Sequence, residues 1–154
     1  MLNLVDEFKK ITEKLNELGI EYAICGGMAM AIHGHLRSTI DIDILILSNS
    51  IEIVKTEMAT FGYLLEASPM SFSDGKIQIE RITKIEKDSG DFLSLDLMIV
   101  TDEIQSIWDT REEVQWDTGS IIVVSKEGLI RLKQFRNSKQ DIVDIEFLEK
   151  ENEQ

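Results

Sequence analysis

Hydrophobic residues near the start of the chain recur at intervals of three and four, the spacing that places side chains on one face of an α-helix. The residues of this stripe are Leu4, Phe8, Ile11, Leu15 and Leu18. Asn3 stands before the stripe as a candidate N-cap, and Gly19 follows it at a position where glycine commonly ends a helix. The pattern therefore predicts a first helix between Asn3 and Gly19.

The hydrophobic segments that follow are short, and they predict the strands of a sheet. These segments are residues 21–25, 40–47, 63–67, 76–87 and 92–100. The isoleucine-rich segment 40–47 is typical of a central strand. The spacing of the isoleucines shifts within 76–87, so we expect a bulge or another irregularity there. Residues 88–91 form a polar turn sequence, which predicts that 76–87 pairs with 92–100.

Helical and hairpin patterns fill the rest of the chain. We expect helices over 28–33, 51–61, 126–136 and 139–150, and a hairpin over 114–124. Ser138 and Asp141 have the spacing of a capping box at the start of the last helix, with Asp in place of Glu. Ile142, Ile145 and Leu148 are expected to form its inward face. This order of elements predicts an α+β (mixed α/β) fold in which helices flank one mixed sheet.

The composition limits the class of protein. A length of 154 residues suits one domain, and we expect residues 1–154 to form it. Hydrophobic residues make up 43% of the chain and charged residues 29%, as in soluble globular proteins. No apolar run is long enough for a transmembrane helix, and the single cysteine, Cys25, excludes an internal disulfide. These features predict a cytoplasmic protein with no membrane segment.

The chain is strongly acidic. Asp and Glu number 29 against 16 Lys and Arg, which gives a net charge of −13. Such a surface repels a phosphate backbone, so nucleic-acid binding is not expected. A nucleoside triphosphate is not excluded, because it arrives with bound magnesium. The simplest interpretation of the acidic balance is solubility.

Two carboxylates stand two residues apart in the predicted central strand. Side chains alternate between the two faces of a strand, so Asp41 and Asp43 project on one side and the neighbouring isoleucines on the other. A divalent cation would relieve the repulsion between the two carboxylates, and oxygen ligands suit Mg²⁺. Asp96 is the lone charge in the apolar strand 92–100, and it would complete the site from a neighbouring strand.

Three such carboxylates suit phosphoryl chemistry. They can hold two Mg²⁺ ions with a substrate phosphate between them, which activates a hydroxyl and stabilises the leaving pyrophosphate. Gly26 and Gly27 stand between a predicted strand and a short helix, where backbone N–H groups can approach phosphate oxygens. The simpler alternatives are solvated strand-end charges for the aspartates and a tight turn for the glycine pair.

The Gly26-Gly27 pair, a spacer of thirteen residues and Asp41-Ile42-Asp43-Ile44 together resemble the motif of the nucleotidyltransferase superfamily that includes DNA polymerase beta. Arg37 and Thr39 before the two aspartates make the string similar to the minimal bacterial branch, which includes antitoxin-type nucleotidyltransferases and AbiEii-like proteins. The similarity extends over about residues 20 to 148, and its specific part is the segment from Gly26 to Asp43. The second motif position is Gly27 where many relatives have serine.

The resemblance implies roles for these residues. Asp41 and Asp43 would ligate both metal ions, Asp96 would ligate one and help to deprotonate the attacking hydroxyl, and Gly26 and Gly27 would face the triphosphate. For three further candidates two readings stay open. Arg37 either contacts phosphate or pairs with a carboxylate; Thr39 either touches substrate or supports the start of the strand; Lys133 either binds the triphosphate or is solvated surface.

The leading hypothesis is a metal-dependent enzyme that moves a nucleoside monophosphate from a nucleoside triphosphate to a hydroxyl acceptor. That acceptor is expected to be small or to belong to a basic or helical partner protein, as in a toxin–antitoxin pair. The alternative is a catalytically silent module that binds nucleotide or neutralises a toxin. A purely structural acidic protein would leave the glycine pair and the paired aspartates unexplained.

Overall fold

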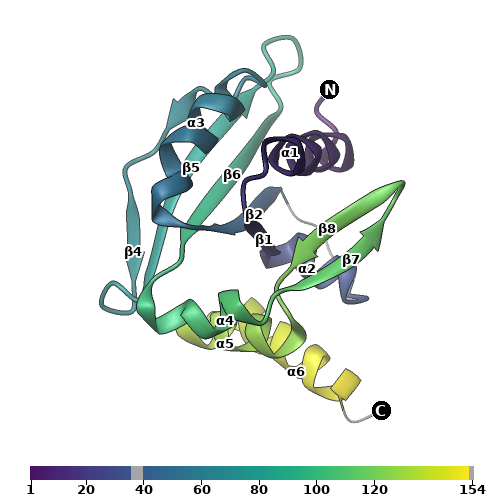
Figure 1. Cartoon of the computed structure of the whole chain (residues 1–154), viewed down its shortest axis with the longest axis vertical. Coiled ribbons are helices and arrows are strands. Elements are labelled where there is room, and N and C mark those ends of the chain that lie inside the picture. The colour runs from purple at the N-terminus through teal and green to yellow at the C-terminus, as the bar shows by residue number, and fades with distance from the viewer. Residues whose placement is uncertain (36–39, 153–154) are drawn as a thin grey trace.

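The computed structural model describes residues 1–35 and 40–152, in which helices and strands are mixed along the chain (Figure 1). The helices are α1 (Leu4–Leu18), α2 (Gly26–Ile32), α3 (Ile51–Ala59), α4 (Gln105–Asp109), α5 (Lys126–Arg136) and α6 (Lys139–Asn152). The strands are β1 (Tyr22–Cys25), β2 (Asp41–Ile46), β3 (Leu65–Glu66), β4 (Met70–Phe72), β5 (Ile77–Ile85), β6 (Phe92–Ile99), β7 (Glu112–Trp116) and β8 (Gly119–Val123). Single turns of 3-10 helix, Ser48–Ser50 and Asp102–Ile104, precede α3 and α4.

The strands form one mixed sheet in the order β3-β5-β6-β2-β1-β8-β7, with β4 paired to β5 outside this path. The β2–β6 and β1–β8 pairs are parallel, and the remaining pairs are antiparallel. The predicted α+β (mixed α/β) class is therefore confirmed. In the part of the chain that the structure describes, no helix is long and apolar enough to cross a membrane.

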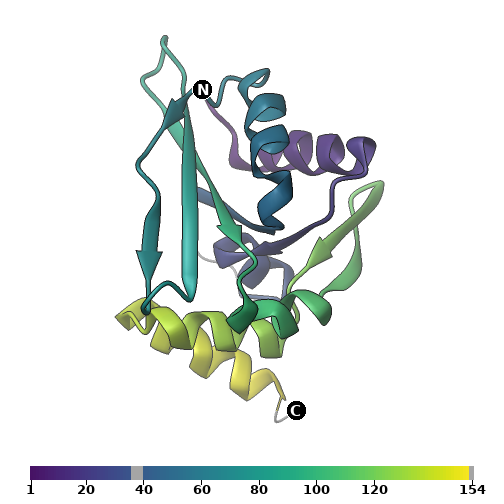
Figure 2. The ribbon, with the colours of Figure 1, turned by 60° about the vertical axis from the view of Figure 1, so that its left-hand side comes forward.

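Helix α1 forms where the hydrophobic stripe predicts it. The Asn3 side chain accepts a hydrogen bond from the backbone N–H of Asp6, and Gly19 ends the helix in the left-handed conformation. Phe8, Ile11 and Leu15 are fully buried. Together α1 and α3 cover one side of the sheet, and α5 and α6 lie across the end of the strands (Figure 2).

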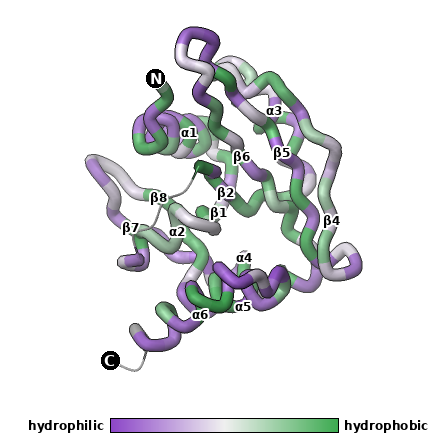
Figure 3. Tube along the Cα trace, turned by 180° about the vertical axis from the view of Figure 1, so that it is seen from behind, coloured by the Kyte–Doolittle hydropathy of each residue, from purple (hydrophilic) through white to green (hydrophobic). Residues whose placement is uncertain are grey.

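Strand β2 is apolar on one face and carries its two aspartates on the other. Ile42, Ile44 and Ile46 of β2 are fully buried, whereas Asp41 and Asp43, which alternate with them, keep partial contact with solvent. The loop between β5 and β6 is largely hydrophilic (Figure 3). The alternation along β2 therefore directs its two carboxylates away from the helices that form the core.

Two expectations for the strands are wrong. No bulge interrupts β5, because its pairing with β6 runs without a break from Gln78–Ile99 to Ile85–Phe92. The strand expected over 63–67 shortens to β3, and the unpredicted β4 pairs with the start of β5. Pairing with a long neighbouring strand, which local spacing does not reveal, decides both outcomes.

The expected inward face of the last helix is right for Leu148 and wrong for Ile142. Ile142 is 47% exposed, whereas Asp141, Asp144 and Leu148 are fully buried. The capping box itself is present, since Ser138 N–H donates to Asp141 and Asp141 N–H donates to the Ser138 hydroxyl. Helix α6 turns two carboxylates inward because α5 supplies the cations that pair with them.

Candidate active site

Four side chains form a row across the sheet. Cys25 of β1 is paired with Asp43 of β2, Asp43 with Asp96 of β6, and Asp96 with Arg81 of β5. Residues directly opposite each other on neighbouring strands point to the same face, so this register brings Asp43 and Asp96 side by side. Asp41, two residues before Asp43 on β2, projects on that same face. The structure thus brings the three candidate carboxylates together.

The carboxylates are progressively buried along this face. The side chain of Asp41 is 33% exposed, and Asp96 as a residue is 5% exposed. Burial, followed by the charges of Asp96 and Asp41, raises the pKa of Asp43 to about 7. The pKa of Asp41 is raised as well, first by burial and then by Asp96. Burial and the neighbouring carboxylates therefore both disfavour the ionised form of Asp43.

The Gly26-Gly27 pair is the first turn of α2 rather than a separate turn before it. Gly26 has a φ angle of 64°, which is in the left-handed region. A Cβ atom at this position would lie 2.1 Å from Asp43 Oδ2, so only glycine lets the backbone approach the carboxylate so closely. Both glycines line the same cavity as the aspartates.

Arg81 is a site residue that sequence reasoning missed. Its Nε and Nη2 atoms donate to the two carboxylate oxygens of Asp96 at 2.7 and 2.9 Å, and Nη2 lies 3.9 Å from Asp41 Oδ2. In sequence Arg81 is one charge in a mixed strand. Only the register between β5 and β6 places it opposite Asp96.

The opposite wall of the cavity comes from α5 and α6 and carries cations. Lys133 is buried, with Nζ 2.8 Å from Asp144 and 3.8 Å from Asp141, so the interpretation of Lys133 as solvated surface is wrong. The Arg136 guanidinium donates to both oxygens of Asp141 at 2.7 and 2.8 Å. Burial opposes ionisation of Asp141, but the hydrogen bonds from Arg136 and Ser138 hold its pKa below the usual value.

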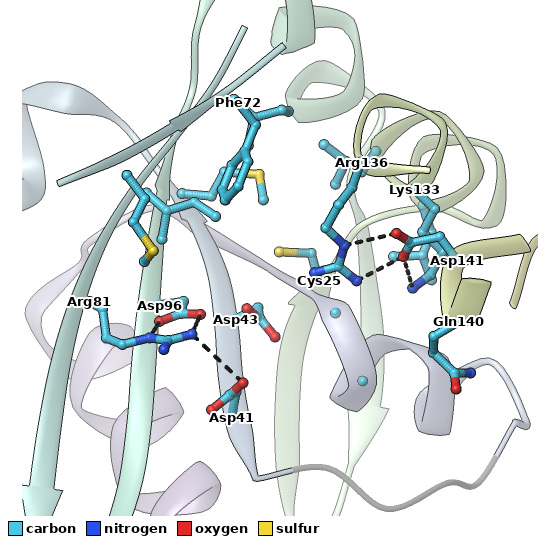
Figure 4. Close-up of a pocket in the computed structure, with 18 residues that line it drawn as sticks. Cys25, Asp41, Asp43, Phe72, Arg81, Asp96, Lys133, Arg136, Gln140 and Asp141 are labelled. Atoms are coloured by element: carbon cyan, nitrogen blue, oxygen red, sulfur yellow. Dashed lines mark hydrogen bonds and ion pairs between the residues drawn. The ribbon is translucent and has the colours of Figure 1, made fainter. Parts of the chain in front are cut away.

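Arg136, like Arg81, was not among the residues predicted for the site. It stands three residues after Lys133 on α5, a spacing that places the two side chains on the same side of the helix. Its side chain is 56% exposed and lines the cavity, so the guanidinium is reachable by a ligand while Asp141 fixes it. Figure 4 shows Arg81 and Asp96 on one side of the cavity, Arg136 and Lys133 on the other, and Asp43 between them.

The cavity has a volume of about 250 Å³. Its third side is apolar and comes largely from the β4–β5 hairpin and β6. The apolar side chains on this side are Met70, Phe72, Ile77, Ile79 and Met98. The hairpin is tied to α5 by a hydrogen bond of 2.8 Å from the Ser73 hydroxyl to the Phe135 carbonyl. The cavity thus combines an acidic wall, a basic wall and an apolar wall.

The carboxylate set fits a divalent cation by its chemistry. Oxygen ligands from adjacent strands suit Mg²⁺, and the raised pKa of Asp43 marks negative charge that a cation would compensate. As the side chains stand, no group of three His, Cys, Asp or Glu residues within the described chain is arranged to hold a metal ion. Arg81 is instead bound to the oxygens of Asp96.

Two of the candidate residues, Arg37 and Thr39, lie outside the described residues. The neighbouring histidines have structural roles. His33 Nε2 lies 2.9 Å from the carbonyl oxygen of Val124, and the ring of His35 packs on Phe147 with centroids 4.3 Å apart.

No protein-family model and no curated protein matches the sequence. Solved structures do match the fold. The lincosamide adenylyltransferase LnuA, bound to lincomycin, has a TM-score of 0.65 at 19% identity, over 94% of this chain and 95% of its own. ANT(2")-Ia in complex with adenylyl-2"-tobramycin has a TM-score of 0.65 at 13% identity, over 94% and 86%. A candidate nucleotidyltransferase from Thermotoga maritima has a TM-score of 0.61 at 16% identity, over 90% and 89%.

These likenesses define the chain as having the nucleotidyltransferase fold. The fold expected from the glycine pair and the paired aspartates is therefore confirmed.

Proposed function

We propose that the protein is a metal-dependent nucleotidyltransferase, which moves a nucleoside monophosphate from a nucleoside triphosphate to a hydroxyl acceptor. The observation that carries this proposal is the register of β2 and β6, which pairs Asp43 with Asp96 beside Asp41 in a cavity faced by Lys133 and Arg136. An acidic wall suits metal ions and a basic wall suits phosphates. The nucleotidyltransferase fold of the chain supports the same reaction.

Each residue of the site would have its own role in the reaction. Asp41 and Asp43 would hold two Mg²⁺ ions and Asp96 one of them, and these ions supply charge stabilisation to the phosphates and the attacking hydroxyl. The acceptor oxygen forms a bond to the α-phosphorus while the bond from that phosphorus to the bridging oxygen breaks and pyrophosphate leaves. Asp96 would take the hydroxyl proton. Gly26 and Gly27 would leave room for the triphosphate beside the carboxylates.

The basic wall would bind the leaving end of the triphosphate. Arg136 is the better placed of its two cations, because its guanidinium is exposed to the cavity while Asp141 holds it by two hydrogen bonds. Lys133 lies behind it, with its charge largely satisfied by Asp144. Arg37 and Thr39 remain further candidates for phosphate contact on the strength of the motif.

The acceptor is either a small molecule or a hydroxyl on a partner protein. LnuA and ANT(2")-Ia were solved with the antibiotic lincomycin and with adenylylated tobramycin. A small acceptor is favoured here by the apolar wall, on which its non-polar part would lie. The net charge of −13 would draw a cationic acceptor or a basic partner protein, such as the toxin of a toxin–antitoxin pair, and it disfavours nucleic acid.

The function is tested first by binding. Each of the four nucleoside triphosphates with Mg²⁺ is added in a thermal-shift assay; at a ligand concentration of about 100 Kd, binding stabilises by about 2.7 kcal/mol. We expect at least one triphosphate to raise the melting temperature, and Mg²⁺ alone to do so weakly. Asp43→Asn should abolish the nucleotide effect, whereas Asp117→Asn, at an exposed ion pair with Lys9, should leave it unchanged.

Turnover then separates an enzyme from a silent binding module. Labelled triphosphate and Mg²⁺ are incubated with the protein and candidate acceptors, and transfer of label is followed together with pyrophosphate release. If the wild type transfers label and Asp43→Asn does not, the result supports the enzyme hypothesis. Stable binding of every component with no transfer to any acceptor would favour the silent module.

A further inference from the structure

Arg81 is a cation on the acidic wall that the proposed reaction does not yet use. It lies directly opposite Asp96 in the antiparallel β5–β6 pair. Its hydrogen bonds of 2.7 and 2.9 Å engage both carboxylate oxygens of Asp96. Its Nη2 atom also approaches Asp41 Oδ2 at 3.9 Å (Figure 4). One guanidinium is thus placed between two of the three carboxylates that would hold metal.

A guanidinium and a divalent cation cannot share this position without cost. A bidentate arginine occupies the carboxylate geometry that a metal ion would need, and two positive centres a few ångströms apart repel each other. Asp96 is also buried, and an ionised carboxylate without a cationic partner is costly there. Arg81 is that partner in the structure, and a metal ion that binds Asp96 has to displace it.

The displaced guanidinium has a destination in the same cavity. The Arg81 side chain is 36% exposed and lines the cavity together with Asp41 and Gly26. The planar fork of arginine fits phosphate oxygens as well as it fits a carboxylate. A triphosphate in the cavity would therefore offer Arg81 a new anionic partner when the metal takes Asp96.

We propose that Arg81 is a positioning residue that holds Asp96 before substrate binds, competes with the divalent cation for this carboxylate, and moves to the triphosphate when metal and nucleotide bind together. The move to the triphosphate rests on the proposed function, whereas the competition with metal does not. The consequence is a coupling: metal binds weakly alone and tightly with nucleotide. Because coupling is reciprocal, the nucleotide gains the same factor from the metal.

The competition is tested with Mn²⁺ alone, whose free concentration is read by electron paramagnetic resonance. We expect Arg81→Gln to bind Mn²⁺ at least about tenfold more tightly than the wild type, within the range of ordinary site couplings. Arg81→Lys should fall between them, because a single ammonium replaces the fork. Loss of a merely structural arginine would leave the Mn²⁺ affinity unchanged or lower it, and that result overturns the proposal.

Arg111→Gln is the matched control. Arg111 donates to the carboxylate of Glu21 at 3.1 Å and lies over the Trp108 ring, so its loss removes the same charge and an ion pair outside the cavity. It is not among the residues that line the cavity. An equal gain in Mn²⁺ affinity for Arg111→Gln would assign the effect to overall charge and overturn the proposal. If Arg81→Gln does not fold, the comparison of Arg81→Lys with the wild type decides.

A non-hydrolysable triphosphate analogue tests whether Arg81 moves to the triphosphate when metal and nucleotide bind together. The analogue should tighten Mn²⁺ binding in the wild type by a larger factor than in Arg81→Gln; an equal factor overturns the transfer of Arg81 to the triphosphate. The two failures are distinguishable. A wild type that binds no nucleotide with any metal contradicts the proposed function, while the Mn²⁺-only comparison still decides whether Arg81 competes for Asp96.

Discussion

The glycine at the start of α2 packs closely against the carboxylate of Asp43. Position 26 favours glycine for two reasons. Its φ angle of 64° lies in the left-handed region, and a Cβ atom there would lie 2.1 Å from Asp43 Oδ2. Gly19 at the end of α1 has a similar φ angle of 68° with no atom within 4 Å of its missing Cβ. The chain thus offers a pair of glycines that separates backbone strain from steric conflict.

Gly26→Ala is therefore expected to be more harmful than Gly19→Ala. The backbone cost of alanine in the left-handed region is about 1–2 kcal/mol at both positions. At Gly26 the steric conflict adds to it, and we expect a total loss of about 3–4 kcal/mol in the free energy of unfolding, within the range of severe substitutions. Urea denaturation of both variants measures the difference. Equal losses would show that Asp43 moves aside without cost.

The raised pKa of Asp43 gives a second prediction at this scale. Its pKa is about 7 in the folded protein against 3.8 for an ordinary Asp, so ionisation of Asp43 disfavours the folded state. The stability that the folded state gains from protonated, neutral Asp43 is fully present below pH 3.8 and is lost as the pH rises through about 7. Without metal, Asp43→Asn should stabilise the protein by on the order of 2 kcal/mol at pH 8.

The gain should shrink as the pH falls, because the wild-type carboxyl then becomes protonated and neutral. Melting temperatures of the variant and the wild type, compared in metal-free buffer at several pH values, measure it. A gain that is independent of pH, or a variant that is less stable than the wild type at pH 8, would contradict a charged and crowded Asp43. Mg²⁺ with nucleotide should reverse the order, since only the wild type binds it.

At the scale of elements, the junction of α5 and α6 is held by charge. Asp141 is buried and joins three groups, because it accepts from Arg136, from the Ser138 hydroxyl at 2.6 Å and from the Ser138 N–H at 2.9 Å. The last helix thus begins at a capping box whose acid also fixes a cation of the cavity. The position of Arg136 depends on this single carboxylate.

Asp141→Ala is expected to destabilise the protein by about 3 kcal/mol, the cost of removing one partner of a buried pair. Because the pKa of Asp141 is lowered, its contribution is present above pH 3.8 and is lost as the pH falls further. Urea denaturation measures the loss. Asp109→Ala, which removes an exposed acceptor of Gln105, is the control and should cost little.

Helices with clear caps could be predicted from local sequence, and strand pairing could not. Asn3 and Gly19 bound α1 as expected, because caps are satisfied by residues within the same turn. The unbroken β5, the short β3 and the existence of β4 depend on partners distant in sequence. The inward face of α6 was predicted correctly at Leu148 but not at Ile142, because two aspartates find their partners in the interior instead.

At the scale of the whole molecule, the same division applies to the candidate site. Asp41, Asp43 and Asp96 could be singled out as candidates, since alternation along a strand and one lone charge in an apolar strand are local features, whereas their meeting depends on the pairing of β2 with β6. Arg81 and Arg136 reach the cavity only through the register of β5 with β6 and the packing of α5 on α6. Their roles, and those of the carboxylates, stay predictions until the experiments above are done.

The row from Cys25 to Arg81 has a consequence for how the protein folds. Its members lie on four strands, and the parallel pairing of Asp43 with Asp96 joins segments that are far apart along the chain. Such contacts form slowly, because a long loop has to close before the pairing repays its entropy. The site therefore does not exist in any early hairpin or helix, and a ligand of the site stabilises the chain only after the central strands have found their register.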